Sequence, residues 1–276
     1  GGASLQPSLK VPGKYERNDW AKGLTAASLG GVLNDLDTFE KLELDESNIG
    51  LSGLAALAVG LENNTSVKEL SLRRGQFDDR AALDLSRIIS KNKHIEKLSL
   101  WGNSLTSDAL FVFEKALTEN TTLTSLDLGM NDQIGNAGAL SICEALRTHT
   151  SLSEVSMRFN QLSPESGEAL AGAIYEQGKR PAGTPGCIVK LDLNSNDLRG
   201  VGVGKVAVAL QSNAHITDLD LNGNLCSDVG ALALWDMLMV NTTITRLHLG
   251  SNQVSDVGLR ALIPVLLKNT ALTSLD

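Results

Sequence analysis

The pattern of apolar and polar positions along this chain recurs at a nearly constant interval. A Leu-x-Leu segment or a close relative, in which apolar side chains alternate with polar ones, starts at positions 42, 70, 98, 126, 155, 191, 219, 247 and 275. Successive starts are 28, 28, 28, 29, 36, 28, 28 and 28 residues apart. Alternation with period two is typical of a half-buried strand, because successive side chains of a strand point to opposite faces. Such a regular interval indicates a repeat architecture.

Each repeat predicts a short strand followed by a helix. After the Leu-x-Leu segment the chain turns, passes a small residue such as Gly230, and continues with apolar residues at helical spacing, as at Leu232, Trp235 and Leu238. One such unit cannot bury its apolar side alone, so neighbouring units must stack. Because helices are wider than strands, the stack bends. The sequence therefore predicts an α/β leucine-rich-repeat solenoid, a curved horseshoe with parallel strands on the concave face and helices on the convex face.

A polar position recurs just after each strand, where the backbone leaves the regular sheet. An Asn amide both donates and accepts, so one side chain can pair the buried N–H and C=O groups of such a turn. Ser47 and Gly75 replace Asn in the first two repeats, and we expect those turns to be looser or to hold water. The predicted structural ladder consists of Asn103, Asn131, Asn160, Asn196, Asn224 and Asn252.

These motifs resemble the ribonuclease-inhibitor-like leucine-rich repeats, a family that includes ribonuclease inhibitor, the sensing ends of NOD-like receptors and Ran GTPase-activating protein. The likeness covers about residues 39–276. It implies the fold and says little of function, because this fold hosts unrelated partners. The chain lacks the cysteine richness and the two-repeat alternation of ribonuclease inhibitor, so no contact residue is carried over.

The repeats suggest two parts of the chain. Residues 1–38 are expected to form an N-terminal arm and a degenerate capping repeat, because Leu24–Asp37 resembles a repeat helix while Lys14–Glu16 makes a poor strand. Residues 39–276 hold about eight 28-residue repeats and the start of a ninth at Leu275. A strand left at the end has an unpaired edge. We expect the natural protein to continue past residue 276, with a dimer through an uncapped C-terminal edge as the alternative.

The interval of 36 residues contains an insertion between Tyr175 and Ile188. Its density of Gly and Pro cannot continue a helix, so we expect an exposed loop on the rim of the solenoid. A partner-specific contact through Lys179 and Arg180 is one interpretation, and a tolerated insertion is the favoured one.

A second local feature, Gly200-Val-Gly202-Val-Gly204, nearly matches a dinucleotide-binding fingerprint. Gly202 occupies the same repeat position as Gly230 and Gly258, however, where the fingerprint is missing. Close packing of the helix start is therefore the favoured explanation.

The composition of the chain argues against some classes of partner. The net charge of −8 gives no general basic footprint for nucleic acid or anionic lipid, and no run of ~20 apolar residues is long enough to span a bilayer. The three cysteines, Cys143, Cys187 and Cys226, are odd in number and far apart, which favours a reducing compartment and a cytoplasmic protein. Glycosylation sequons such as those at Asn120 and Asn241 recur at one point of the repeat, so a repeated turn explains them more simply.

No constellation for catalysis is visible. The four histidines and three cysteines do not converge in the predicted repeat geometry, so we expect no metal, no cofactor, no catalytic residue and no enzymatic activity. Asp192 and Asp220 should lie about 5 Å apart on neighbouring strands. That proximity could raise a pKa or hold a cation, although a water-facing acidic row is the favoured interpretation.

The side chains between and just after the leucines should face the concave side, where packing does not choose them. Aromatic residues and Arg are enriched in binding hot spots, and this chain has only 4% aromatic residues. A cluster of them in repeats 2 to 5 therefore suggests a partner-binding surface, with incidental surface as the alternative. The candidate residues are Arg73, Arg74, Trp101, Met130, Arg158 and Phe159.

The favoured function is a protein–protein interaction or scaffold module that binds a protein or peptide on its concave face, as part of a longer chain and without nucleic acid or membrane partners. One alternative is a GTPase activator of the Ran-specific type, which needs an exposed arginine for transition-state charge; Arg73 and Arg74 are the candidates. Another is the repeat region of an effector whose enzymatic domain is missing. A monomer is expected unless the C-terminal edge pairs.

Overall fold

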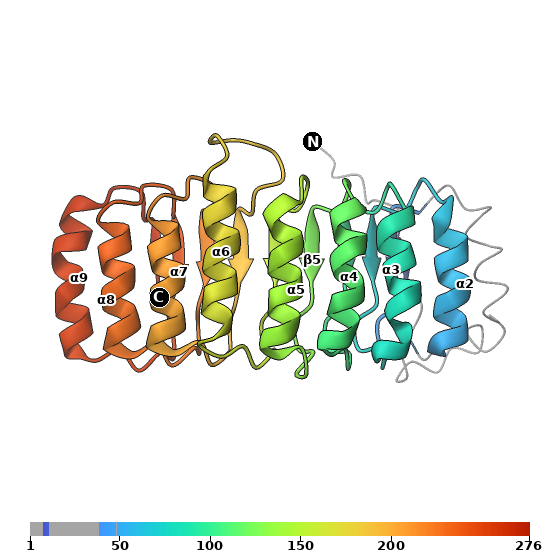
Figure 1. Cartoon of the computed structure of the whole chain (residues 1–276), viewed down its shortest axis with the longest axis horizontal. Helices are drawn as coiled ribbons and strands as arrows, with labels where there is room; N and C mark the ends of the chain where they lie inside the picture. Colours follow the sequence, from blue (N-terminus) through green and yellow to red (C-terminus); the bar gives the residue numbers. More distant parts are fainter. Residues whose placement is uncertain (1–7, 11–38, 48) are drawn as a thin grey trace.

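The computed structural model describes residues 8–10, 39–47 and 49–276, and these contain one sheet of ten parallel strands (Figure 1). The strands are hydrogen-bonded in chain order from β1 to β10, so each repeat adds one strand beside the last. They are β1 Ser8–Lys10, β2 Lys41–Glu43, β3 Glu69–Ser71, β4 Lys97–Ser99, β5 Ser125–Asp127, β6 Glu154–Ser156, β7 Lys190–Asp192, β8 Asp218–Asp220, β9 Arg246–His248 and β10 Ser274–Leu275.

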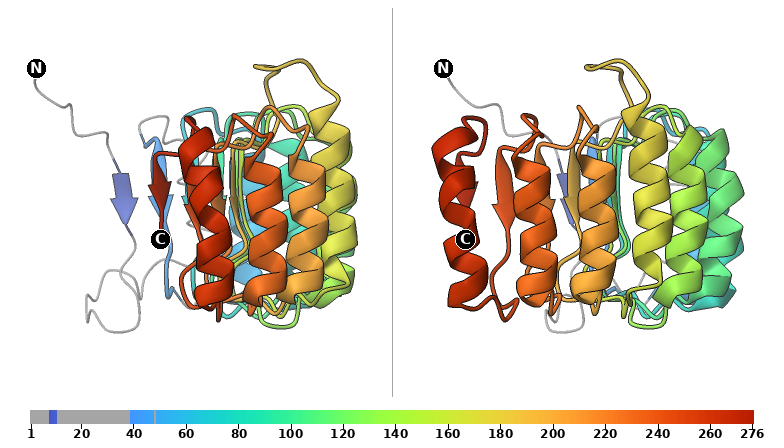
Figure 2. Two further views of the ribbon diagram at one scale, coloured as in Figure 1. Left: turned by 90° about the vertical axis from the view of Figure 1, so that its left-hand side faces the viewer. Right: turned by 60° about the vertical axis from the view of Figure 1, so that its left-hand side comes forward.

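One helical segment follows each strand from β2 to β9, and all of these segments lie on the same side of the sheet (Figures 1 and 2). Figure 2 shows the strands on the inner side of an arc and the helices on its outer side. The predicted solenoid is thereby confirmed. The helices are α2 Gly50–Glu62, the 3-10 turn η2 Asp79–Ala81 leading into α3 Ala82–Lys91, α4 Ser107–Glu119, α5 Gly135–Thr148, α6 Ser166–Gly178, α7 Arg199–Leu210, α8 Ser227–Leu238 and α9 Asp256–Lys268.

The strand register follows the leucine pattern of the sequence. Leu42 is paired with Leu70, Leu70 with Leu98, and the same alignment continues to Leu275. From β2 to β9 these central apolar residues are at most 3% exposed, because they point between the sheet and the helices. Aliphatic side chains therefore stack into one continuous core along the whole arc.

The Asn position after each strand pairs the backbone of two neighbouring repeats. Asn131, for example, donates from Nδ2 to the carbonyl oxygens of Leu100 (3.1 Å) and Leu128 (2.9 Å), and its Oδ1 accepts from the N–H of Leu105 (3.1 Å). The side chain is fully buried. Such bonds matter because a buried backbone group left without a partner costs about 1–3 kcal/mol.

The first two repeats depart from this ladder in different ways. Ser47 is buried, and its hydroxyl has no hydrogen-bond partner among the described residues. At Gly75 the ring of Phe77 fills the space beside the glycine, and the looser turn stays a prediction. A Cβ on Gly75 would come within 2.4 Å of Phe77 Cε2.

A second buried amide ladder lies at the opposite turn, after each helix. Asn120 donates from Nδ2 to Ile89 O (2.6 Å), and its Oδ1 accepts from the N–H groups of Thr122 and Leu123. Asn120 and Asn241 are each 3% exposed, so their amides are committed to the turn, as the repeat interpretation of the sequons predicts.

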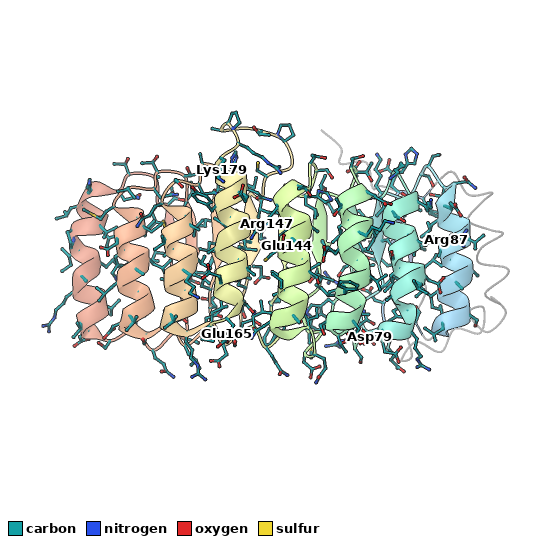
Figure 3. The ribbon with its side chains drawn as sticks, viewed as in Figure 1. Asp79, Arg87, Glu144, Arg147, Glu165 and Lys179 are labelled. Atoms are coloured by element: carbon teal, nitrogen blue, oxygen red, sulfur yellow. The ribbon has the colours of Figure 1, made fainter. Side chains whose placement is uncertain are left out.

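The insertion forms the expected exposed loop on the rim, above the end of α6 (Figures 1 and 3). Lys179 lies at its start, where its Nζ is 4.6 Å from the centroid of the Tyr175 ring. Arg180 instead turns inward: its guanidinium donates to the carbonyl oxygens of Arg147 and His149, both at 2.9 Å. Because those carbonyls end α5, Arg180 acts as a structural clamp between the loop and that helix.

The predicted capping segment 24–37 and the weak strand 14–16 lie outside the described residues, while β1 extends the sheet beside β2. Gly200, Gly202 and Gly204 lie inside α7, and a Cβ on Gly202 would come 3.1 Å from Pro164 Cα. Close packing with the preceding repeat therefore explains Gly202, and close packing with the following repeat explains Gly200, where a Cβ would come 2.9 Å from Cys226 O.

Candidate partner-binding surface

Arg73 lies across the concave face between β3 and β5. Its Nε donates to Ser99 Oγ (2.8 Å), and its Nη2 is 3.4 Å from Asp127 Oδ2. Ser99 Oγ donates to the same carboxylate oxygen at 3.0 Å. These contacts hold the guanidinium across two neighbouring repeats although its side chain is 47% exposed. A side chain ordered in this way loses less entropy when it binds a partner.

Arg74 and Trp101 form a stacked pair beside it. The guanidinium carbon of Arg74 lies 4.8 Å from the centroid of the Trp101 ring, and Arg74 Nη1 is 3.2 Å from Glu46 Oε1. Trp is the aromatic side chain that attracts a cation most strongly. The indole N–H of Trp101 has no hydrogen-bond partner in the described part of the chain. The pair offers a half-buried ring and an accessible cation.

Gly129 leaves room for the side chains of Trp101 and Arg158. A Cβ at this position would lie 2.7 Å from Trp101 Cδ1 and 2.9 Å from Arg158 Cγ, so both side chains occupy the space above the glycine. Arg158 Nε is 3.8 Å from Asp192 Oδ2, which is too long for a hydrogen bond. Arg158 therefore leans over the face toward the acidic repeats that follow.

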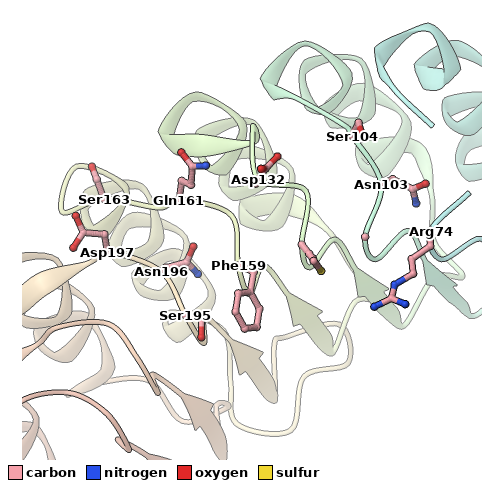
Figure 4. A pocket seen from close by; sticks show the side chains of 12 residues that line it. Arg74, Asn103, Ser104, Asp132, Phe159, Gln161, Ser163, Ser195, Asn196 and Asp197 are labelled. Carbon is pink, nitrogen blue, oxygen red and sulfur yellow. The ribbon is translucent and has the colours of Figure 1, made fainter. Parts of the chain in front are cut away.

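A groove of about 790 Å³ runs along the edge of the sheet where the strands end (Figure 4). Figure 4 shows Arg74 and Phe159 on its strand side and Asp132 and Gln161 on its helix side. Met130 occupies in its repeat the position of Phe159 and also lines the groove. The remaining lining residues are Gly102, Asn103, Ser104, Ser163, Ser195, Asn196 and Asp197.

The strand side of the groove is built from one repeat position with a left-handed backbone. In each repeat from β2 to β9 the residue there has φ between +50° and +70°. Such a backbone suits glycine and costs other residues on the order of 1 kcal/mol. The residues at this position are Glu46, Arg74, Gly102, Met130, Phe159, Ser195, Gly223 and Ser251.

Large side chains at this position are not explained by stability. Met130 is 45% exposed and Phe159 is 49% exposed, so neither gains the full free energy of burial that would offset its strained backbone. Exposed large apolar side chains that gather in one place are typical of interaction sites.

The structure brings the six predicted residues onto one continuous surface, which we call the concave patch: Arg73, Arg74, Trp101, Met130, Arg158 and Phe159. Three of them line the groove and the others lie on the adjoining sheet face. That they bind a partner stays a prediction.

The repeats beyond the patch carry negative charge on the same face. Burial raises the pKa of Asp220, and the nearby charge of Asp192 raises it further. Within the described ranges, no group of three or more His, Cys, Asp or Glu side chains is arranged to hold a metal ion.

Sequence reasoning missed a link between two histidines. It treated all four as scattered, whereas Arg180 contacts two of them: its guanidinium donates to His149 O, and its own carbonyl oxygen is 3.1 Å from His215 Nε2. His149 takes the place of Asn in the second amide ladder, since its Nδ1 accepts from the N–H groups of Ser151 and Leu152. Burial lowers the pKa of His149 to about 4, and the charge of Arg180 contributes. Alignment of His149 with Asn120, one repeat earlier, could have revealed this role.

The helix side of the groove was also missed. Asp132 and Gln161 follow the left-handed position by two residues, and the predicted repeat did not assign that place to any surface. Their polar side chains, next to an apolar strand side, are the signal that an alignment of the repeats would have shown.

The fold defines a leucine-rich-repeat solenoid, and comparison with known proteins places it more closely. The TMOD/LMOD leucine-rich domain profile matches residues 26–172, more than half of the chain, and a further leucine-rich-repeat profile matches residues 240–262. The chain therefore belongs to the TMOD/LMOD leucine-rich domain family.

Individual relatives cover only part of the chain. Leiomodin-2 from Homo sapiens is 30% identical over 132 residues, which are 48% of this chain and 24% of that protein. NACHT, LRR and PYD domains-containing protein 12, also from Homo sapiens, is 24% identical over 205 residues, or 63% of this chain and 18% of that protein. The chain thus spans about a quarter or less of the length of these relatives.

Among solved structures, one described as leiomodin-1 actin-binding site 2 is 26% identical, with a TM-score of 0.42, and covers 46% of this chain and 75% of that one. A tropomodulin C-terminal domain from Caenorhabditis elegans is 14% identical, with a TM-score of 0.46, and covers 59% and 92% of the two chains. Among the helices that the structure describes, none is both long and apolar enough to cross a membrane.

Proposed function

We propose that this chain is a protein-interaction module without catalytic activity of its own, and that its partner binds the concave patch. The observation that carries the proposal is that Met130 and Phe159 place large exposed side chains on a strained backbone position that Gly or Ser occupies in the repeats of β4 and β7 to β9. Trp101 and Arg158, whose side chains both lie over Gly129, adjoin these side chains. An aromatic and arginine-rich centre of this kind is typical of binding hot spots.

Actin is the first partner to test, because the chain belongs to the TMOD/LMOD family and a leiomodin-1 structure is described as an actin-binding site. We propose a cytoplasmic location, which agrees with three cysteines that are free and buried.

GTPase activation is not part of the proposal. A catalytic arginine must reach the phosphate of a bound nucleotide. Arg73 is tied to Ser99 and Asp127, and Arg74 is stacked on Trp101 beside Glu46. Measuring GTP hydrolysis by a panel of small GTPases with this chain present tests that choice, and acceleration of any of them would overturn it.

The double variant Trp101→Ala/Arg158→Ala tests the binding proposal. Truncation of two hot-spot side chains costs several kcal/mol, so affinity for actin should fall by about 100-fold or more in a sedimentation or anisotropy titration. The matched control is Phe111→Ala/Arg260→Ala, which removes an exposed aromatic ring and an exposed arginine from the convex side.

The control should bind like the unmodified protein. Equal affinity of the patch variant and the control would dismiss the concave patch. A native chain that does not bind actin at all would dismiss actin as the partner.

A further inference from the structure

The groove beside the concave patch is charged differently at different points along its length. At the β3 end, Arg74 lines the groove with a guanidinium group whose side chain is 54% exposed, beside its 3.2 Å contact with Glu46 Oε1. Two repeats further on, Asp132 lines the helix side. Asp132 is exposed, and its carboxylate has no hydrogen-bond or ion-pair partner among the residues that the structure describes. A cation of a partner is therefore free to approach it.

Met130 and Phe159 form the apolar part of this groove. They lie on the strand side, in successive repeats beyond Arg74, and each exposes nearly half of its surface. An occupant of the groove would bury these surfaces, and burial of apolar area is the main favourable term in most association. The apolar part begins opposite Asp132 and continues past it.

The groove offers side chains rather than backbone groups for recognition. The N–H of Arg74 donates to Trp101 O (2.9 Å), that of Met130 to Arg158 O (2.8 Å), and that of Phe159 to Asn194 O (2.9 Å). Because these donors are already paired between repeats, a bound peptide cannot add to them as a further strand. Its specificity must come from the charges and apolar surfaces of its side chains.

The repeat spacing sets the dimensions of the occupant. Neighbouring parallel strands lie about 4.8 Å apart, so Met130 is about 10 Å from Arg74 along the arc, and Ser195 about 19 Å. An extended chain rises about 3.3 Å per residue. About seven residues of extended peptide therefore span the groove, and a side chain at Asp132 stands about three residues from one at Arg74.

We infer that the groove binds an extended segment of a partner protein in which an acidic and a basic side chain stand about three residues apart, the acidic one at Arg74 and the basic one at Asp132, with large apolar side chains against Met130 and Phe159. This inference rests on the proposed function and specifies the chemistry of the partner. In a segment with two acidic side chains, the second is repelled by Asp132. In a segment with two basic side chains, the first is repelled by Arg74. Either segment therefore loses one ion pair and gains one repulsion.

Three acetylated and amidated heptapeptides test this chemistry in fluorescence anisotropy titrations at low salt. All three contain Leu at the third and fifth positions and Ser elsewhere, and they carry at the first and fourth positions Asp and Lys, Asp and Asp, or Lys and Lys. The Asp/Lys peptide should bind the unmodified protein about tenfold more tightly than either of the others. Because the pairs lie on an open surface, raising the salt concentration should reduce the difference.

Charge reversals supply the decisive comparison. Arg74→Glu makes both sites acidic and should make the Lys/Lys peptide the tightest binder, while Asp132→Lys makes both basic and should favour the Asp/Asp peptide. The backbone tolerates the first change, since Glu46 occupies the same left-handed position one repeat earlier. The matched control is Arg80→Glu, which reverses an arginine that pairs with Asp78 outside the groove lining. It should keep the original preference.

Equal affinity of the three peptides for the unmodified protein, or a preference that neither reversal changes, would overturn the inference. Either result leaves the proposed function intact if Trp101→Ala/Arg158→Ala still weakens binding of the whole partner. If peptide selectivity follows the charge reversals but Trp101→Ala/Arg158→Ala leaves binding of the whole partner unchanged, the groove chemistry is upheld, and Trp101 and Arg158 are excluded from the binding surface.

Discussion

The repeats from β3 to β6 and those from β7 to β9 share one backbone but differ in the surface they present. Both have a buried apolar residue at the strand centre, a buried Asn after most strands, and a left-handed residue between them. At the left-handed position on the strand side of the groove, three of the four residues in the first region are large, namely Arg74, Met130 and Phe159, whereas the three in the second region are small, namely Ser195, Gly223 and Ser251. Since the backbone is the same, the difference lies in side chains that packing does not select. We propose that it reflects binding rather than folding.

If the two regions share one backbone, the buried Asn ladder after the strands should stabilise both to the same extent. Removing one Asn side chain of this ladder should have the largest effect on stability. Asn131→Ala in the first region and Asn224→Ala in the second each leave a buried N–H and two buried carbonyl groups with fewer partners. We expect each to lower the free energy of unfolding by about 3–4 kcal/mol, as measured in urea.

Ser47→Ala is the control for these substitutions. The Ser47 hydroxyl lacks a partner among the described residues, so its loss should change stability by less than about 1 kcal/mol. If Asn131→Ala were as mild as Ser47→Ala, or far milder than Asn224→Ala, the two regions would not share the same support.

A smaller effect on stability is expected from the pH at the turn before β6, where His149 replaces the Asn of other repeats. The unfolded chain binds a proton at His149 near the ordinary pKa of 6.5, and the folded chain only near a pKa of about 4. As the pH falls between these values the unfolded state binds more protons, so up to about 3 kcal/mol of stability is lost.

His149→Asn should retain the turn and remove this loss, because Asn120 and Asn241 accept the equivalent N–H groups in their repeats. Urea unfolding at pH 7 and pH 4.5 measures the difference. A stability loss on acidification that is the same in both proteins would show that His149 is not responsible.

The two regions also show what the sequence could and could not reveal. The strand register was predictable, because a one-residue shift of a strand would turn its leucines to solvent. The ladder was predictable from the chemistry of an amide. The left-handed position was not, since Met130 and Phe159 carry no sign of it until they are aligned with Gly102 and Gly223. The inward turn of Arg180 depends on a loop whose path no periodicity describes.

The common position of the Trp101 and Arg158 side chains over Gly129 could not be predicted from the sequence either. The sequence places both side chains on the concave face, but their common position depends on the space that Gly129, one repeat from each, leaves free. Glycine is common in turns, so Gly129 gave no indication that two large side chains lie above it.

The most direct test of the account replaces the left-handed residues of each region by glycine. Met130→Gly/Phe159→Gly and Ser195→Gly/Ser251→Gly relieve the same backbone strain, so each double variant should keep the stability of the unmodified protein to within about 1 kcal/mol. Only the first should lose affinity for the partner, by about tenfold or more. Unchanged affinity in that variant, or a large loss of stability confined to it, would contradict the claim that these side chains are present for binding.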